Sequence, residues 1–229
     1  MPVAIITGAS KGFGRALALD LARDGWSLVL DGRSERALSD AAREMGTTGA
    51  VVRPITGDVT DPAHRAALVD GARELGSLDL LVNNASTLGP SPLLTLAAYP
   101  LDELRRVFEV NVLAPLALIQ ESLALLRASN GVVVSVTSDA SVEPYETWGG
   151  YGASKAALDQ SHRVMAREEP GLRFYLFDPG DMRTDMHQAA FPGEDISDRP
   201  EPEVVVPMLR RLLASASASG RYQSSEWAS

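Results

Sequence analysis

Short apolar runs alternate with longer segments of helical periodicity along most of this chain. The runs at residues 3–7, 27–31, 50–55, 78–82, 131–137 and 172–177 are apolar over most of their length and predict buried strands. Between them, apolar residues recur every three or four positions, as in Phe13, Leu17 and Leu21, which predicts helices. This alternation indicates an α/β protein whose parallel sheet is covered by helices on both faces.

Several residues mark where the predicted elements begin, end or bend. Ser34 is a good N-cap for a helix after the second strand, and Pro62 suits the first turn of a helix that runs to about residue 76. A long helical region at 101–128 contains Asn111 and then Pro115, and the proline predicts a kink. The helix that contains Tyr151 runs to about residue 169.

The carboxyl-terminal third ends with three further predicted features. The segment 181–202 is polar and proline-rich, which predicts a flap beside a site. Residues 203–214 predict a last amphipathic helix, and the tail after residue 220 predicts an edge strand.

Composition fits a protein with one buried core. The 229 residues suffice for a single α/β domain, and we expect one domain over residues 1–229. The formal net charge of −9 excludes a general nucleic-acid binder, because phosphate binding needs a basic surface. The chain has no cysteine, which excludes disulfides and thiolate metal sites, and we expect no metal site.

We expect no membrane-spanning segment. The apolar stretch 110–126 is interrupted by Asn111, Gln120 and Glu121. The first six residues lack the basic region of a signal peptide and run directly into a glycine loop. Together with the lack of cysteine, this favours a cytoplasmic location.

A glycine-rich loop joins the first strand to the first helix. Its sequence is Thr7-Gly8-Ala9-Ser10-Lys11-Gly12-Phe13-Gly14. In this context glycines let backbone N–H groups approach a dinucleotide pyrophosphate, and the helix N-terminus favours negative charge. A tight turn without a ligand would look similar, so the loop alone is weak evidence.

The end of the second strand offers two opposite charges, Asp31 and Arg33. A carboxylate at this place accepts hydrogen bonds from the ribose hydroxyls of NAD, whereas an arginine pairs with the 2′-phosphate of NADP. A charge-assisted bond from Arg33 would contribute about 1.5–3 kcal/mol, tenfold or more in affinity. The alternative for Arg33 is a solvated surface charge.

Polar residues follow the next strands. Asp58 follows the third strand, where it either reaches an adenine amino group or closes the turn, and Asn83-Asn84 follow the fourth strand. Ser138 follows the fifth strand, and ligands of open α/β sheets bind outside the carboxyl ends of strands. Asn111 is either exposed to the site by the kink or a surface residue.

Tyr151 and Lys155 lie four residues apart, which places both side chains on one face of a helix. A tyrosine with a pKa near 10 is a poor acid or base at neutral pH, and a neighbouring ammonium group lowers that pKa. Only two of the 21 basic residues are lysines, Lys11 and Lys155, which suggests that a lysine is needed at both places. The alternative is an exposed pair without a role.

In this order and spacing, these motifs closely resemble the short-chain dehydrogenase/reductase family over residues 3–186. The resemblance implies a Rossmann-type doubly wound parallel β-sheet with helices on both faces, strand order 3-2-1-4-5-6 and a seventh strand at the end. The short flap and tail resemble the sepiapterin-reductase-like and benzil-reductase-like branch. The implied reaction is hydride transfer between a nicotinamide and a carbonyl or secondary alcohol of a small organic substrate.

The resemblance also implies a role for each motif residue. Ser138 binds the substrate carbonyl oxygen, Tyr151 donates or accepts the proton, Lys155 lowers the Tyr151 pKa and holds the nicotinamide ribose, and Asn111 anchors a water of the proton relay. The implied cofactor contacts are Gly8, Ser10, Lys11, Gly12, Phe13, Gly14, Arg33, Asp58, Val59, Asn84, Ala85, Tyr151, Lys155, Pro179, Gly180 and Thr184.

The implied cofactor is NADP(H) rather than NAD(H). Family members that use NAD usually have an acid where this chain has Gly32, and Lys11 matches a basic residue common in members that use NADP. Asp31 speaks against this choice, because its carboxylate would weaken binding of a nearby 2′-phosphate. Ser86 replaces the usual glycine after Asn-Asn-Ala, and we expect little effect from it.

The expected partners are a small-molecule carbonyl or alcohol substrate and further copies of the chain, as a homodimer or homotetramer. The apolar stretch 113–126 suits such an interface, although a core role explains it equally well. Whether Asp139, Trp148 and His187 contact the substrate stays open. Two alternative functions are a catalytically silent NADP(H)-sensing regulatory protein and an epimerase or dehydratase of the same fold.

Overall fold

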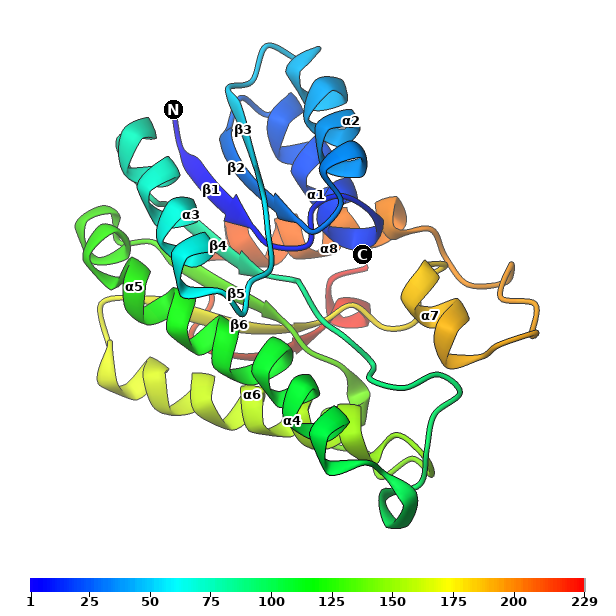
Figure 1. Ribbon diagram of the computed structural model, residues 1–229. Helices are drawn as coiled ribbons and strands as arrows, with labels where there is room; N and C mark the ends of the chain where they lie inside the picture. The colour runs from blue at the N-terminus through cyan, green and yellow to red at the C-terminus, as the bar shows by residue number, and fades with distance from the viewer. Residues whose placement is uncertain (229) are drawn as a thin grey trace.

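The computed structural model describes residues 1–228, and its centre is a seven-stranded parallel sheet (Figure 1). The strand order is β3-β2-β1-β4-β5-β6-β7, which confirms the predicted doubly wound arrangement and the seventh edge strand. The strands are β1 (Val3–Ile6), β2 (Ser27–Gly32), β3 (Val52–Thr56), β4 (Leu80–Asn83), β5 (Val132–Val136), β6 (Arg173–Asp178) and β7 (Gly220–Gln223).

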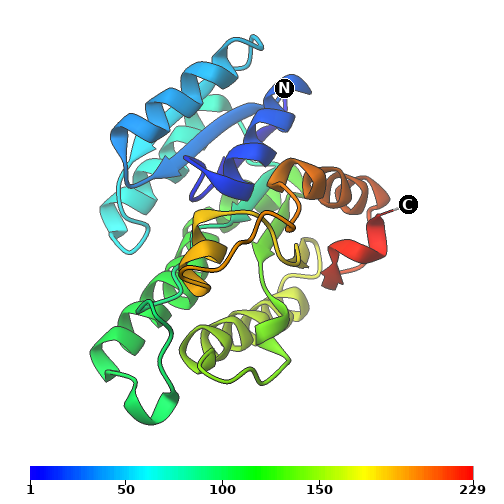
Figure 2. The same ribbon diagram turned by 90° about the vertical axis from the view of Figure 1, so that its right-hand side faces the viewer.

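Helices connect the strands and cover both faces of the sheet (Figures 1 and 2). They are α1 (Gly12–Arg23), α2 (Glu35–Gly46), α3 (Pro62–Leu75), α4 (Leu101–Phe108), α5 (Ala114–Ser129), α6 (Gly149–Glu168), α7 (Asp185–Ala190) and α8 (Pro202–Ser215). Single helical turns lie at Leu96–Ala98, Glu109–Leu113, Asp139–Ser141 and Ser224–Trp227.

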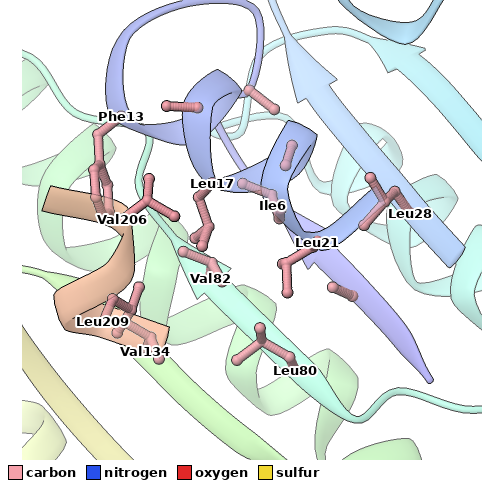
Figure 3. Packing of buried hydrophobic residues seen from close by; sticks show 14 of the residues in the cluster. Ile6, Phe13, Leu17, Leu21, Leu28, Leu80, Val82, Val134, Val206 and Leu209 are labelled. Carbon is pink, nitrogen blue, oxygen red and sulfur yellow. The ribbon is translucent and has the colours of Figure 1, made fainter. Parts of the chain in front are cut away.

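Two apolar layers hold the helices on the sheet. On one face α1, α2 and α8 pack through residues such as Leu17, Leu38 and Leu209, all fully buried (Figure 3 shows Leu17 and Leu209). On the other face α3, α5 and α6 pack against the sheet through Leu68, Ile119 and their neighbours. Because both faces are covered, β1 and β2 are buried along their whole length, which explains why they appear as mostly apolar runs in the sequence.

The predicted helix starts agree with the capping chemistry. The Ser34 hydroxyl accepts a hydrogen bond from the Ala37 backbone N–H at 3.3 Å, and Pro62 is the first residue of α3. The Asp61 carboxylate caps α3 by accepting from the Ala63 backbone N–H at 2.9 Å.

The long helical region does bend, and its bend is a π-helical turn. Residues Glu109–Leu113 form this turn between α4 and α5, and Pro115 lies in the first turn of α5. The continuous stretch Leu101–Ser129 is long and apolar enough to cross a membrane by composition. Its buried residues, among them Leu118, Ile119 and Leu126, pack on the sheet.

The segment 181–202 contains a short helix that the sequence pattern did not predict. Helix α7 has six residues, and the hydroxyl of Thr184 caps it by accepting from the His187 backbone N–H at 3.2 Å. Six residues are too few to show a helical period among polar neighbours.

We predict that Leu209→Ala lowers the free energy of unfolding by about 2–5 kcal/mol, because the change leaves a cavity between α8 and the sheet. The matched control is Leu101→Ala, since the Leu101 side chain is 65% exposed, and it should change the value by less than about 0.5 kcal/mol. Urea unfolding of both variants measures the difference, and equal values would contradict this packing.

Candidate active site

A cavity of about 880 Å³ lies along the carboxyl ends of the strands. Nearly all site residues predicted from the sequence line it, from Gly8 and Arg33 at one end to Ser138, Tyr151 and Lys155. The two exceptions are Asn111 and Gly14, which lie behind its wall. The topology therefore brings together residues that are up to 176 positions apart, from Gly8 to Thr184.

The glycine-rich loop is held open toward the cavity by its neighbours. Gly8 has φ +64°, a left-handed conformation that favours glycine. A Cβ on Gly14 would lie 2.4 Å from Asn84 Nδ2, so only glycine leaves room for that amide. The Asn84 Nδ2 donates to the carbonyls of Thr7 at 2.8 Å and Gly8 at 3.1 Å.

The Thr7 hydroxyl completes this support, and the sequence analysis did not single it out. It accepts hydrogen bonds from the backbone N–H groups of Asn84 and Ala85, both at 3.0 Å. The loop and the turn after β4 thus form one rigid cradle next to the N-terminus of α1. Such a cradle with unobstructed backbone groups fits a dinucleotide phosphate.

The Asp31 carboxylate is buried and hydrogen-bonded within the protein. Its carboxylate accepts from the Gly8 backbone N–H at 3.0 Å and bonds the Nε2 of His64 at 2.6 Å. Both side chains are almost completely buried. Both residues line the cavity, but Arg33 is exposed, whereas the Asp31 carboxylate is buried and already hydrogen-bonded, so the positive charge is the one that is available to a ligand.

Asp58 closes its own turn while it also lines the cavity. Its carboxylate accepts from the Thr60 backbone N–H at 3.0 Å and from the Thr60 hydroxyl at 2.8 Å. The backbone hydrogen bond from Thr60 is the main cause of a lowered Asp58 pKa, which burial partly opposes. Of the two roles considered for Asp58, the structure shows the one in which its carboxylate closes the turn. Val59 lies beside Asp58 in the cavity wall.

Lys11 extends from the glycine loop toward helix α7. Its ammonium group lies 2.7 Å from the Asp185 carboxylate, and both side chains are largely exposed. Pro179, Gly180 and Thr184 line the same part of the cavity.

Helix α6 carries Tyr151 and Lys155 on its buried face. The Lys155 Nζ donates to the backbone carbonyl of Val136, the last residue of β5, at 2.8 Å. The same Nζ lies 5.4 Å from the centroid of the Tyr151 ring. Tyr151 is 8% exposed and Lys155 is 2% exposed, so the pair lies at the floor of the cavity. The alternative hypothesis of an exposed Tyr151/Lys155 pair is therefore wrong.

The pKa of Tyr151 is raised overall and not lowered as expected, so the charge of Lys155 does not offset the effect of burial. Burial raises the pKa of the Tyr151 phenol well above its ordinary value, and hydrogen bonds with Ser138 and Ser86 only partly oppose this. Burial also lowers the pKa of Lys155 to about 8, although Asp159 favours the charged form. In this structure the phenol therefore keeps its proton at neutral pH, which is the state that a proton donor needs.

Ser138 lies at the carboxyl end of β5, as predicted, and it has an acidic neighbour. Its hydroxyl donates to Asp139 Oδ1 at 2.9 Å, and the Tyr145 hydroxyl donates to Asp139 Oδ2 at 2.8 Å. Asp139 and Tyr145 line the cavity beside Ser138.

Asn111 is buried inside the π-helical turn and does not line the cavity, so it is neither a surface residue nor exposed to the site, as the two alternatives had it. Its Nδ2 donates to the Thr87 carbonyl at 2.8 Å and the Ser154 hydroxyl at 3.0 Å. Its Oδ1 accepts from the Ser86 hydroxyl at 3.1 Å. Ser86, from which we expected little effect, thereby connects Asn111 with Tyr151.

Apolar and aromatic side chains form the cavity wall beside Tyr151. The Trp148 ring meets the Tyr151 ring edge-on at 5.8 Å, and Phe191 lies 5.9 Å from Trp148. His187 packs on Phe191 at 4.9 Å, and its buried Nε2 has no hydrogen-bond partner in the described residues. Trp148 and His187 are thus part of this wall.

Comparison with known proteins agrees with this geometry. The family model for short chain dehydrogenases matches residues 2–195. Sepiapterin reductase of Mus musculus is 35% identical over 201 residues, which cover 82% of this chain and 77% of that protein. Benzil reductase ((S)-benzoin forming) of Saccharomyces cerevisiae is 35% identical over 195 residues, which cover 81% of this chain and 73% of that protein.

A solved structure shares nearly the whole fold. The alcohol dehydrogenase from the archaeon Thermococcus sibiricus, complexed with 5-hydroxy-NADP, superposes with a TM-score of 0.88 at 28% identity, covering 97% of this chain and 95% of that chain. The predicted resemblance to sepiapterin and benzil reductases is confirmed. The chain therefore belongs to the short-chain dehydrogenase/reductase family, whose members are oxidoreductases that act on carbonyl and alcohol groups with a nicotinamide cofactor.

Proposed function

We propose that this protein is an NADPH-dependent carbonyl reductase that uses Tyr151 as the proton donor. The observation that carries the proposal is the buried Tyr151 phenol at the floor of the cavity, with Lys155 over its ring and Ser138 beside it. The glycine loop fits the cofactor's phosphates, since Gly8 and Gly12 line the cavity in left-handed conformations at the N-terminus of α1.

When bound, the cofactor supplies a hydride to the carbonyl carbon. Ser138 orients the carbonyl oxygen by donating a hydrogen bond to it. This bond replaces the one that the Ser138 hydroxyl donates to Asp139 in the structure. The Tyr151 hydroxyl then donates its proton to the same oxygen, which leaves an alcohol. Lys155 supplies a nearby positive charge that stabilises the phenolate formed in this step.

Tyr151 regains its proton from solvent, through a water that Asn111 anchors. The Ser86 hydroxyl lies beside the phenol and donates to the Asn111 amide oxygen, so it holds these two groups next to each other. In the oxidising direction the same water carries the proton from the phenol to solvent.

Arg33 is the reason for preferring NADPH to NADH. It is exposed at the end of β2, whereas the carboxylate of Asp31 is already bonded by Gly8 and His64. The objection that Asp31 would repel a 2′-phosphate is thereby weakened, because the carboxylate is buried and already hydrogen-bonded to His64 and a backbone N–H group.

The substrate class that fits the wall is a compact ketone with a second polar group, such as a vicinal dicarbonyl or a pterin-type ketone. Trp148 and Phe191 offer flat apolar surface, and Asp139 with Tyr145 offers polar contacts near Ser138. The sepiapterin and benzil reductases among the relatives support this class.

The intact proton-transfer set argues against a silent NADP(H) sensor, which would have no use for it. An epimerase or dehydratase of the same fold stays the alternative, since its chemistry also needs a proton donor. A homodimeric or homotetrameric assembly and a cytoplasmic location stay predictions.

We predict that Tyr151→Phe lowers kcat for diketone reduction by about 10²–10⁴-fold while NADPH binding survives, because the variant loses only the proton donor. Tyr175→Phe is the matched control: it removes another buried hydroxyl, bonded to the Ser217 carbonyl outside the cavity. Steady-state kinetics with a panel of vicinal diketones checks this. Near-normal turnover of Tyr151→Phe would refute the role of Tyr151.

We predict that Arg33→Met weakens NADPH binding about tenfold or more and leaves NADH binding nearly unchanged, because only NADPH carries the 2′-phosphate. Arg36→Met is the matched control, since its side chain is 95% exposed on α2. Fluorescence titration with both nucleotides measures the constants. Equal losses for NADPH and NADH would contradict this role of Arg33.

We predict that kcat/KM for NADPH falls as the pH rises through about 8, where the Lys155 ammonium of the free enzyme loses its proton. The sign follows from the charge: the cation is present below its pKa and absent above it. In Lys155→Arg the cation persists to high pH, so the decline near pH 8 should vanish even if the rate is lower. A wild-type profile that is flat between pH 7 and 9.5 would contradict the prediction.

A further inference from the structure

Arg221 on the last strand reaches toward the candidate active site from outside the cavity. The C-terminal strand and turn are drawn in red in Figure 2, and β7 pairs with the carboxyl half of β6. Arg221 stands opposite Leu176 in this pairing, and its side chain is 14% exposed. It does not line the cavity, and the sequence motifs gave no reason to select it.

The guanidinium of Arg221 joins three groups that belong to three different elements. Its NH2 nitrogen donates to the Asp178 carboxylate at the end of β6, at 2.7 Å, and to the backbone carbonyl of Ser138 after β5, at 3.1 Å. Its Nε lies 3.4 Å from the Asp159 carboxylate on helix α6.

Each of these three acceptors is also bonded to, or belongs to, a residue next to the proposed catalytic groups. Asp159 lies one helical turn after Lys155, and it accepts from the Thr137 hydroxyl at 2.6 Å and the Ser141 hydroxyl at 2.8 Å, on both sides of Ser138. Asp178 accepts from the Gly180 backbone N–H at 3.0 Å and so shapes the turn with Pro179. The Ser138 carbonyl belongs to the residue that is proposed to bind the substrate oxygen.

Charge balance gives the guanidinium a second effect. Asp159 and Asp178 are both nearly fully buried, and Arg221 is the arginine that lies within 4 Å of both carboxylates in the described residues. Without it, the buried carboxylate of Asp178 would lose its arginine, and Lys155 would be left as the cation that interacts with Asp159.

We propose that Arg221 is a positioning residue for Ser138: from the C-terminal strand it fixes the Ser138 backbone and the two carboxylates that flank it. The proposal rests on the proposed function, because it assumes that Ser138 acts in the reaction. An arginine suits this place because its planar fork can serve several acceptors at fixed angles, which a lysine ammonium cannot do. The C-terminal strand is in this way a working part of the site.

A double-mutant cycle tests the proposal. Turnover of the best diketone of a panel that begins with benzil is measured at saturating NADPH, well below the melting temperature, for wild type, Arg221→Met, Ser138→Ala and the double variant. We expect Arg221→Met to lower kcat about tenfold or more in the wild-type background. In the Ser138→Ala background the change Arg221→Met should lower kcat less than about threefold, because the Ser138 hydroxyl that Arg221 positions is already gone.

Two further variants separate positioning from stability. Arg210→Met is the matched control: it removes a guanidinium that is also shared between two carboxylates, Asp20 and Asp24, on the surface of α1 and α8. It should leave kcat within about twofold of wild type. Arg221→Lys keeps the charge and should fold like wild type, while recovering only part of kcat, and it serves where Arg221→Met fails to fold.

The outcomes distinguish this inference from the proposed function. Wild-type kcat in Arg221→Met or in Arg221→Lys, or the same fold-loss in both backgrounds, would overturn the role of Arg221. Wild-type kcat in Ser138→Ala would instead overturn the role of Ser138, and with it the inference that rests on it.

Discussion

The parallel register of the sheet is the constraint on which the rest of this structure depends. Seven strands point the same way, so their carboxyl ends meet along one edge. Gly8, Arg33, Asp58, Asn84, Ser138 and Pro179 each follow a different strand, and each therefore reaches the same cavity. The apolar layers on the two faces maintain this register, and the polar chemistry is confined to the edge.

Burial of polar groups at that edge is tolerated because nearly all of them are paired. Asn111 uses both ends of its amide within the protein, and Asp31 is shared by Gly8 and His64. Such satisfied networks fix the conformation of the loops they join, whereas an unpaired buried group would destabilise the fold. The cavity floor is therefore rigid, and the exposed Lys11–Asp185 pair bridges its rim.

Much of the fold and the motif set could be predicted because they follow from local rules. Apolar runs, a serine cap and a proline at a helix start are readable along the chain, and Tyr151 with Lys155 is a spacing within one helix. The contacts of Ser86, His64 and Arg221 join residues far apart in sequence, so no local sequence pattern predicts them. The raised Tyr151 pKa was missed for a related reason: it depends on burial, which spacing does not reveal.

The hydrogen bonds of Asp31 with Gly8 and His64 limit how the cofactor preference can be redesigned. An engineer who wishes to shift the proposed preference for NADPH toward NADH cannot rely on that carboxylate, because releasing it would remove the hydrogen-bond partner of both Gly8 and His64. A new acid would have to stand at Gly32, where an added Cβ would lie 3.2 Å from the Ser10 side chain. The success of such a swap therefore depends on whether the Ser10 side chain of the glycine loop can shift by a few tenths of an ångström to admit the new residue.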